Sequence, residues 1–187
     1  MERKRGKKII EKILQVTALD LILVFIPLLY YYRKNKSVKK SFSELGIKRI
    51  EKKQLAKKSA EILGGLIAIV FIISLASSFF NVNDLGKVTE TVKAITFTSP
   101  LLLLYYMTVR VTAEEIFFRG FLVSKTGIWV SSIAFGLAHF MYGSVIEVFG
   151  AFIAGLFLAY FFQKNNNLVP NIIGHMAYNA VSLLMVM

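Results

Sequence analysis

Two adjacent glutamates and an arginine stand in an otherwise apolar stretch of this 187-residue sequence, VTAEEIFFRG. Ionisable side chains are costly inside a membrane helix, and by default they mark a functional site or a satisfied ion pair. Residues four apart lie on one face of a helix, about 6 Å apart along its axis, so Glu115 is expected to pair with Arg119. Adjacent residues diverge by about 100°, so Glu114 is expected to point elsewhere as an unneutralised carboxylate, suited to act as a general base.

The only two histidines of the chain stand in similar apolar stretches. His139 lies four residues after Phe135 in FGLAHF, and His175 lies four residues before Asn179 in GHMAYN, so each pair shares a helix face. Measured from the expected helix ends, a rise of 1.5 Å per residue places Glu114 and these polar groups at depths of about 10 to 18 Å. Three separate helices therefore present polar groups at a similar depth.

Each of these groups also has a plain structural interpretation. A lone histidine or asparagine in a membrane helix commonly forms a hydrogen bond to another helix, and a Glu–Arg pair commonly holds helices together. Phe135 by itself is a core residue. Arg110 and Glu147 are expected near the interfaces or in ion pairs, without a functional role. Two acids, two imidazoles and an amide at matched depth favour a shared site over separate structural roles.

The composition indicates a membrane protein, because 56% of the residues are hydrophobic and the mean hydropathy is +0.60. Residues 62–80 are uncharged throughout, which is about the length needed to cross a hydrocarbon core of roughly 30 Å. Such long and evenly apolar runs suit helices and not barrel strands. We expect an all-α, polytopic membrane helix bundle with about six membrane segments, at residues 16–32, 62–80, 94–123, 127–142, 144–162 and 168–187. The absence of cysteine excludes disulfides, thiolate nucleophiles and cysteine zinc sites.

The charge is distributed very unevenly along the chain. Residues 1–58 hold 17 of the 23 Lys and Arg residues and 5 of the 11 acidic residues, so the net charge of +12 lies there. We expect residues 1–60 to form a basic N-terminal region with one anchor or interfacial helix and a cytoplasmic loop, and residues 61–187 to form a membrane-embedded helical bundle.

The loop at residues 33–58 carries eleven basic residues, which favours the cytoplasmic side and contact with anionic lipids of the bilayer. No motif indicates nucleic-acid binding. This orientation puts the turns at Lys125 and Lys164 inside and the loop at 81–93 outside, and it leaves the side of the N-terminus open.

Three short motifs follow one another on the expected helices: Glu114-Glu115-x3-Arg119, Phe135-x3-His139 and His175-x3-Asn179. In this order they resemble the CAAX-protease and bacteriocin-processing (CPBP or Abi) family of intramembrane proteases, which is related to the Ras-converting enzyme. The resemblance covers about residues 95–187, which is then a protease-like core. It implies a multi-pass intramembrane endopeptidase that cleaves a membrane-associated protein or peptide, either a CAAX-type prenyl-protein or a leader or bacteriocin peptide.

The resemblance also implies roles for individual residues. Glu114 and His139 would activate water, and His175 and Asn179 would stabilise the oxyanion of the tetrahedral intermediate. The site would open toward the cytoplasmic side. Supporting positions would be held by Glu115, Arg119 and Phe135.

Other interpretations of the same residues stay open. Glu114, His139 and His175 also form the ligand set of a catalytic zinc site, although water activation by these side chains requires no cofactor. Buried acids and histidines equally suit a proton- or ion-coupled membrane transporter. A polar cluster that only holds helices together would suit a non-catalytic membrane immunity or adaptor protein.

Overall fold

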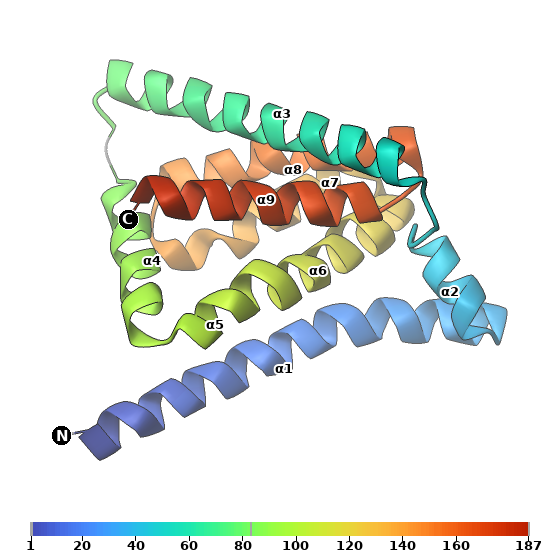
Figure 1. Ribbon diagram of the computed structural model, residues 1–187, viewed down its shortest axis with the longest axis horizontal. Helices are drawn as coiled ribbons and strands as arrows, with labels where there is room; N and C mark the ends of the chain where they lie inside the picture. Colours follow the sequence, from blue (N-terminus) through green and yellow to red (C-terminus); the bar gives the residue numbers. More distant parts are fainter. Residues whose placement is uncertain (1, 83, 187) are drawn as a thin grey trace.

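The computed structural model describes residues 2–82 and 84–186, and the side chains of residues 17–82, 84–96 and 99–185. The described residues form helices and no strand, so the predicted all-α class is confirmed. Figure 1 shows long helices lying side by side and a short one, α4, crossing one end. In chain order the α-helices are α1 (Glu2–Asn35), α2 (Val38–Glu44), α3 (Lys52–Phe79), α4 (Gly86–Thr98), α5 (Pro100–Tyr105), α6 (Val111–Glu114), α7 (Ser124–Ala138), α8 (Val145–Asn165) and α9 (Val169–Val186).

Three described helical runs are long and apolar enough to cross a membrane: Lys52–Phe79, Pro100–Tyr142 and Val145–Asn165. They overlap four of the expected segments, because Pro100–Tyr142 contains two antiparallel legs. The total of about six membrane segments stays a prediction, as does the division of the chain near residue 60, which falls within α3.

The segment expected at 94–123 is interrupted near its start. Residues 94–98 belong to α4, and the chain breaks at Ser99, whose backbone is extended (φ −158°, ψ 99°). The Ser99 hydroxyl accepts a hydrogen bond from the backbone N–H of Leu102, and Pro100 follows at the first helical position. Both features begin a new helix, so the membrane-crossing run starts at Pro100.

The run from Pro100 is not a uniform α-helix. It is π-helical at Tyr106–Arg110 and again at Glu115–Val123, on either side of α6. π-Helical turns are rare and often occur at functional sites. At Gly127 the backbone leaves the helical region (φ 84°, ψ 175°), and α7 packs back against the segment Glu115–Val123. The turn expected near Lys125 is therefore present.

Small residues let the helices approach closely, as is common between membrane helices. A Cβ atom added at Gly136 of α7 would lie 2.9 Å from the carbonyl oxygen of Val148 in α8. Gly174 of α9 lies equally close to α3, where a Cβ would meet Ile62 at 2.6 Å. These contacts fix the helices that carry the two histidines.

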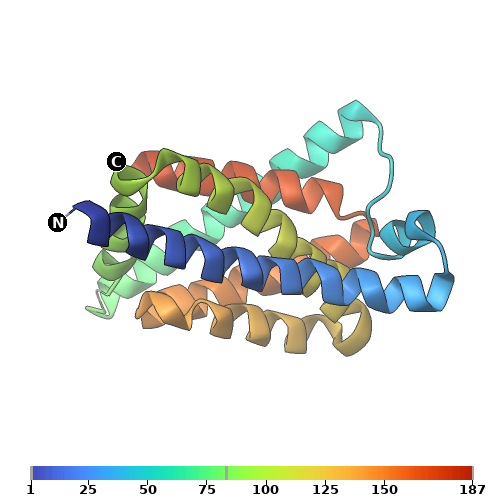
Figure 2. The same cartoon turned by 90° about the horizontal axis from the view of Figure 1, so that it is seen from below.

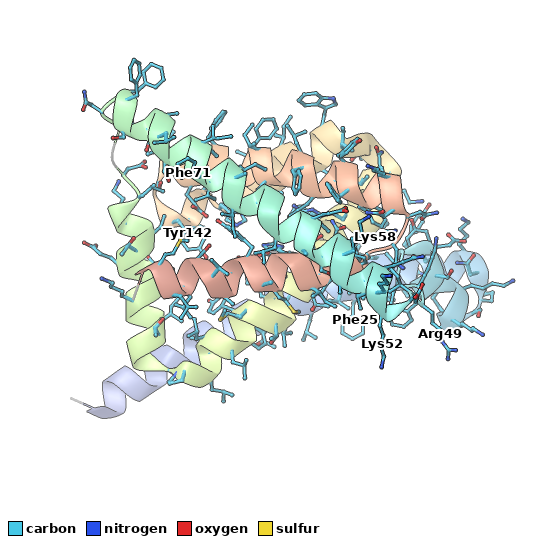
Figure 3. The ribbon with its side chains drawn as sticks, turned by 45° about the horizontal axis from the view of Figure 1, so that its top comes forward. Phe25, Arg49, Lys52, Lys58, Phe71 and Tyr142 are labelled. Carbon is cyan, nitrogen blue, oxygen red and sulfur yellow. The ribbon has the colours of Figure 1, made fainter. Side chains whose placement is uncertain are left out.

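The basic loop and the two basic turns lie at one end of the bundle (Figure 1). The backbone N–H of Leu168 donates to the carbonyl oxygen of Gly46, and the Asn167 side chain donates to the carbonyl oxygen of Lys48. Lys125 Nζ donates to the hydroxyl of Tyr30. Figure 3 shows the labelled basic side chains gathered at this end, away from Tyr142. We call it the basic end.

The opposite end is formed by α4, by the short 3-10 helix Phe140–Tyr142 and by the two chain termini (Figures 1 and 2). Asp84 accepts hydrogen bonds there from Ser144 and from the backbone N–H groups that begin α8. Lys87 Nζ donates to the carbonyl oxygen of Gly143 at 3.0 Å. These bonds tie α4 to the loop that follows His139, and we call this the α4 end.

Candidate active site

One cavity of about 290 Å³ brings together the residues to which the sequence assigned chemistry. Glu114, His139, His175 and Asn179 all line it. They come from α6, from the end of α7 and from α9, so three separate helices supply them. Glu114 therefore faces the interior of the bundle and not the surrounding lipid.

Glu114 is 8% exposed and is held by Arg110, four residues earlier in the chain. Arg110 Nε donates to Glu114 Oε1 at 3.0 Å. The expectation that Glu114 is unneutralised is therefore wrong, whereas the expectation that Arg110 lies in an ion pair is confirmed. The spacing rule that predicts the Glu115–Arg119 pair also applies in the other direction along the helix, from Glu114 to Arg110.

His139 is oriented by its own helix. Its Nδ1 lies 2.9 Å from the carbonyl oxygen of Phe135, which can only accept, so Nδ1 carries the hydrogen. In the neutral ring, Nε2 then has the free lone pair. The His139 ring packs edge to face against the Phe135 ring, with 4.7 Å between the ring centroids. It also stacks on the Tyr142 ring, with 5.9 Å between the centroids. The predicted shared face of Phe135 and His139 is confirmed.

Glu115 and Arg119 lie behind the cavity wall, at 0% and 1% exposure. Arg119 Nη1 is 3.2 Å from Glu115 Oε1, so the predicted ion pair is confirmed. The contact has the distance of a salt bridge but not the geometry of a hydrogen bond, and the three guanidinium nitrogens have no hydrogen-bond partner among the described residues. The Phe135 ring covers the guanidinium at 3.9 Å, a cation–π contact.

His175 is joined to this buried pair. Its Nδ1–H donates to Glu115 Oε1 at 3.0 Å, and Asn171 Nδ2 lies 3.5 Å from Glu115 Oε2. Asn171 also donates to the carbonyl oxygen of Leu158 at 2.9 Å. Glu115 thus fixes the ring of His175 so that Nε2 is the nitrogen left for the cavity, and Asn179 lines the cavity one turn further along α9.

Sequence reasoning missed a second polar cluster beside Glu114. Asp20 of α1 is 2% exposed, and it accepts hydrogen bonds from Tyr105 at 2.8 Å and from Arg110 Nη1 at 3.2 Å. A single acid in the apolar run 16–32 was a usable signal, because an isolated charge there needs a partner. Nothing in the local spacing indicated that the partner would be Arg110, which is 90 residues away.

The zinc alternative finds no support in the arrangement of the side chains. Among the described residues, no three His, Asp or Glu side chains are placed to hold a metal ion together. The hydrogen bonds themselves do not exclude a metal, because they use only Nδ1 of each histidine and Oε1 of Glu114 and leave both Nε2 atoms and Oε2 free. The placement of the three side chains, and not their hydrogen bonds, is what fails to match a zinc centre.

The cavity extends toward the α4 end. Its lining includes Leu85 and Val92 around α4 and Tyr142 beside it, and it contains no residue of the basic loop. The sequence predicts that the loop at 33–58 and the opening of the site both face the cytoplasm. In the structure the loop lies at the basic end and the cavity extends toward the α4 end, so these two predictions conflict.

Comparison with protein families identifies the part of the chain that carries the cavity motifs. Residues 96–181 match the family model described as type II CAAX prenyl endopeptidase Rce1-like. The family resemblance is thereby confirmed for this segment. The match begins one residue from the expected start of the protease-like core and includes all three motifs. No curated protein and no solved structure matches the chain.

The family and the apolar helices together give a coarse functional assignment. An Rce1-like segment supports an intramembrane peptidase acting on a protein or peptide in the membrane. The three candidate spans agree with an integral membrane protein.

Proposed function

We propose that this protein is an intramembrane endopeptidase that hydrolyses a peptide bond in a membrane-associated protein or peptide. The observation that carries the proposal is the common cavity. It gathers an acid, two imidazoles and an amide from three helices within an Rce1-like segment. Peptide hydrolysis needs a positioned base and preorganised donors in a site with restricted water, and this set of side chains supplies both.

Glu114 acts as the general base in this proposal. Arg110 takes Oε1, so Oε2 is the oxygen that accepts a proton from water. His139 Nε2 accepts the other hydrogen of the same water, since Nδ1 is already bonded to Phe135. The water oxygen then forms a bond to the carbonyl carbon of the substrate. When the C–N bond breaks, the proton held by Glu114 passes to the leaving amine.

His175 and Asn179 act on the opposite side of the tetrahedral intermediate. The Asn179 amide donates to the oxyanion, and so does Nε2–H of His175 when both ring nitrogens carry hydrogen. Glu115 is the anion that faces Nδ1 in that state. Glu115 and Arg119 would therefore hold His175 in place without touching the substrate.

The walls of the cavity favour an apolar substrate segment. Val70, Ile73, Val88 and Leu183 line it away from the polar residues. Such a surface suits a prenyl chain beside a CAAX sequence, or the apolar part of a leader or bacteriocin peptide. We propose one of these membrane-associated classes as the substrate.

We further propose a multi-pass topology in which the basic loop contacts anionic lipids. The chain has no cysteine, so single cysteines can report which end faces the cytoplasm. Lys48→Cys marks the basic end and Asn81→Cys the α4 end. Labelling of Asn81→Cys from the cytoplasmic side supports a site that opens there, and it contradicts contact of the basic loop with the anionic cytoplasmic leaflet. Labelling of Lys48→Cys from the cytoplasmic side supports that lipid contact and contradicts a site that opens toward the cytoplasm.

Peptidomics of membranes tests the activity and requires no assumption about the substrate. Cells carrying the wild-type chain should contain a new peptide terminus that cells carrying Glu114→Gln or His139→Ala lack. Glu44→Gln is the matched control, because it removes an acid from an exposed ion pair at the basic end, and it should give the wild-type pattern. Identical termini in the wild-type and Glu114→Gln membranes would contradict the proposal.

Chelation separates this proposal from the zinc alternative. Because the proposed steps use only protein side chains and water, cleavage of the identified peptide should survive treatment with EDTA. Loss of cleavage that added Zn²⁺ restores would support the zinc site instead.

A further inference from the structure

Helix α1 lies outside the segment matched by the family model, yet it contributes a buried charge beside the cavity. Asp20 is surrounded by the bundle, and both of its oxygens are used: Oδ2 by Tyr105 and Oδ1 by Arg110. Buried charges persist only where they are paired and hydrogen-bonded. The contact fixes α1 to the helix that carries Glu114.

Arg110 bridges two acids. Its Nη1 donates to Asp20 and its Nε donates to Glu114, at 3.2 and 3.0 Å. A guanidinium is planar and rigid, so anchoring one edge on α1 sets the direction of the N–H that reaches Glu114. The bond to Glu114 therefore has an orientation that α1 helps to determine.

Without Asp20, the same guanidinium could turn to face Glu114 alone. Arginine binds carboxylates most strongly through two parallel hydrogen bonds, which would occupy both oxygens of Glu114. The observed geometry uses only Oε1. Sharing the cation between two acids keeps one carboxylate oxygen out of the ion pair.

We infer that Asp20 and Arg110 are positioning residues for Glu114: Asp20 holds the Arg110 guanidinium so that it takes Oε1 and leaves Oε2 for the attacking water. This inference rests on the proposed function, since it takes Glu114 as the base. It extends the site to α1, which has no counterpart in the motifs.

Steady-state kinetics of the purified full chain test the inference, with a quenched fluorescent farnesylated CAAX peptide as the probe. Asp20→Asn and Arg110→Met should each lower kcat by about tenfold or more, with little change in KM, because they displace the base and not the substrate. The double variant should be no slower than Arg110→Met alone, since both changes act through the same contact. Arg110→Lys keeps the charge but lacks the planar fork that fixes the direction of the N–H toward Glu114, so it should not restore kcat.

Glu44→Gln provides the matched control, as an isosteric change of another ion-paired acid, and should leave kcat unchanged. Melting temperatures in detergent identify any variant that does not fold. If Arg110→Met does not fold, the kcat values of Asp20→Asn and Arg110→Lys test the inference instead. Both variants are expected to fold, because Arg110 keeps Glu114 as an ion-pair partner in Asp20→Asn and the positive charge is kept in Arg110→Lys.

The outcomes separate the two proposals. Wild-type kcat in Asp20→Asn and Arg110→Met, together with an inactive Glu114→Gln, overturns the positioning role and leaves the peptidase intact. Losses that multiply in the double variant, or that appear in KM instead of kcat, indicate independent packing roles and also overturn it. A wild-type chain that cleaves the probe no faster than Glu114→Gln and produces no new terminus in membranes overturns the proposed function and this inference together.

Discussion

Glu114 and Glu115 are neighbours in the chain, but they lie in two different regions of the fold. Glu114 lines the cavity and shares Arg110 with a second acid from α1. Glu115 is fully buried and provides the only carboxylate within ion-pair distance of Arg119 among the described residues. Both carboxylates have an arginine four residues away, yet only the first is accessible to a ligand in the cavity. The surroundings in the fold, and not the local motif, therefore decide which of the two carboxylates is accessible from the cavity.

The largest expected effect follows from replacing the cavity carboxylate. Glu114→Gln should lower the rate of peptide cleavage by about 100- to 10,000-fold, the usual contribution of a general base. The melting temperature should change little, because Arg110 keeps Asp20 as an ion-pair partner. Both quantities are measured on detergent-purified protein. A variant that keeps its activity, or that loses it only by unfolding, would remove the distinction drawn between the two glutamates.

The buried carboxylate should behave in the opposite way. Glu115→Gln leaves the Arg119 charge inside the bundle without a counter-charge, which costs about 3–5 kcal/mol of stability. It also weakens the contact that orients His175. Thermal and SDS-induced unfolding should show the loss, with Glu114→Gln as the isosteric control one position away. Equal stability of the two variants would contradict the conclusion that Glu115 stabilises the fold as the counter-charge of Arg119.

A smaller effect is expected from the ring that separates the two regions. Phe135 covers the Arg119 guanidinium and also contacts His139. Phe135→Leu should cost about 1–2 kcal/mol more than Phe162→Leu, since both remove a buried ring but only Phe135 has a cation over its face. Unfolding measurements on both variants check the difference. A cost no greater than that of Phe162→Leu would show that the cation–π contact adds nothing to packing.

The smallest effect is expected from Asp84, a carboxylate outside the candidate membrane spans. Its contribution to stability serves as a reference for those of Glu114 and Glu115. The Ser144 hydroxyl, followed by the backbone N–H groups of Val145 and Ile146, holds the pKa of the Asp84 carboxyl below its ordinary value of 3.8. A lowered pKa in the folded state means that Asp84 stabilises the fold at pH values above about 4, and that this contribution is lost as the pH falls through the lowered value.

Asp84→Asn should therefore remove a small, acid-sensitive part of the stability. The melting temperatures of the variant and the wild type should differ slightly at pH 7 and converge as the pH falls below about 4. A constant difference across this range would mean that the charge of Asp84 contributes nothing to the cap of α8.

Much of the local structure was predictable from the sequence. The apolar runs gave the helices at 62–80, 144–162 and 168–187 to within a few residues, apart from the N-terminal extension of α3. Spacing alone gave the contact between Phe135 and His139. The prediction of one continuous segment at 94–123 was wrong. Ser99 and Pro100 begin a new helix within an apolar run, and hydropathy shows no break there.

The sequence by itself determined the helical class, the basic first third, the three motifs and the ion pair between Glu115 and Arg119, because these depend on composition and on spacing within one helix. The tertiary structure alone decided that Arg110 is shared between Glu114 and Asp20, that His175 rests on Glu115, and that the cavity extends toward the α4 end. The contact between Arg110 and Asp20 joins residues 90 positions apart, and the contact between His175 and Glu115 joins residues 60 positions apart. Such pairs meet only when glycine contacts and helix packing bring their helices together, and helical periodicity carries no information about which helices will be neighbours.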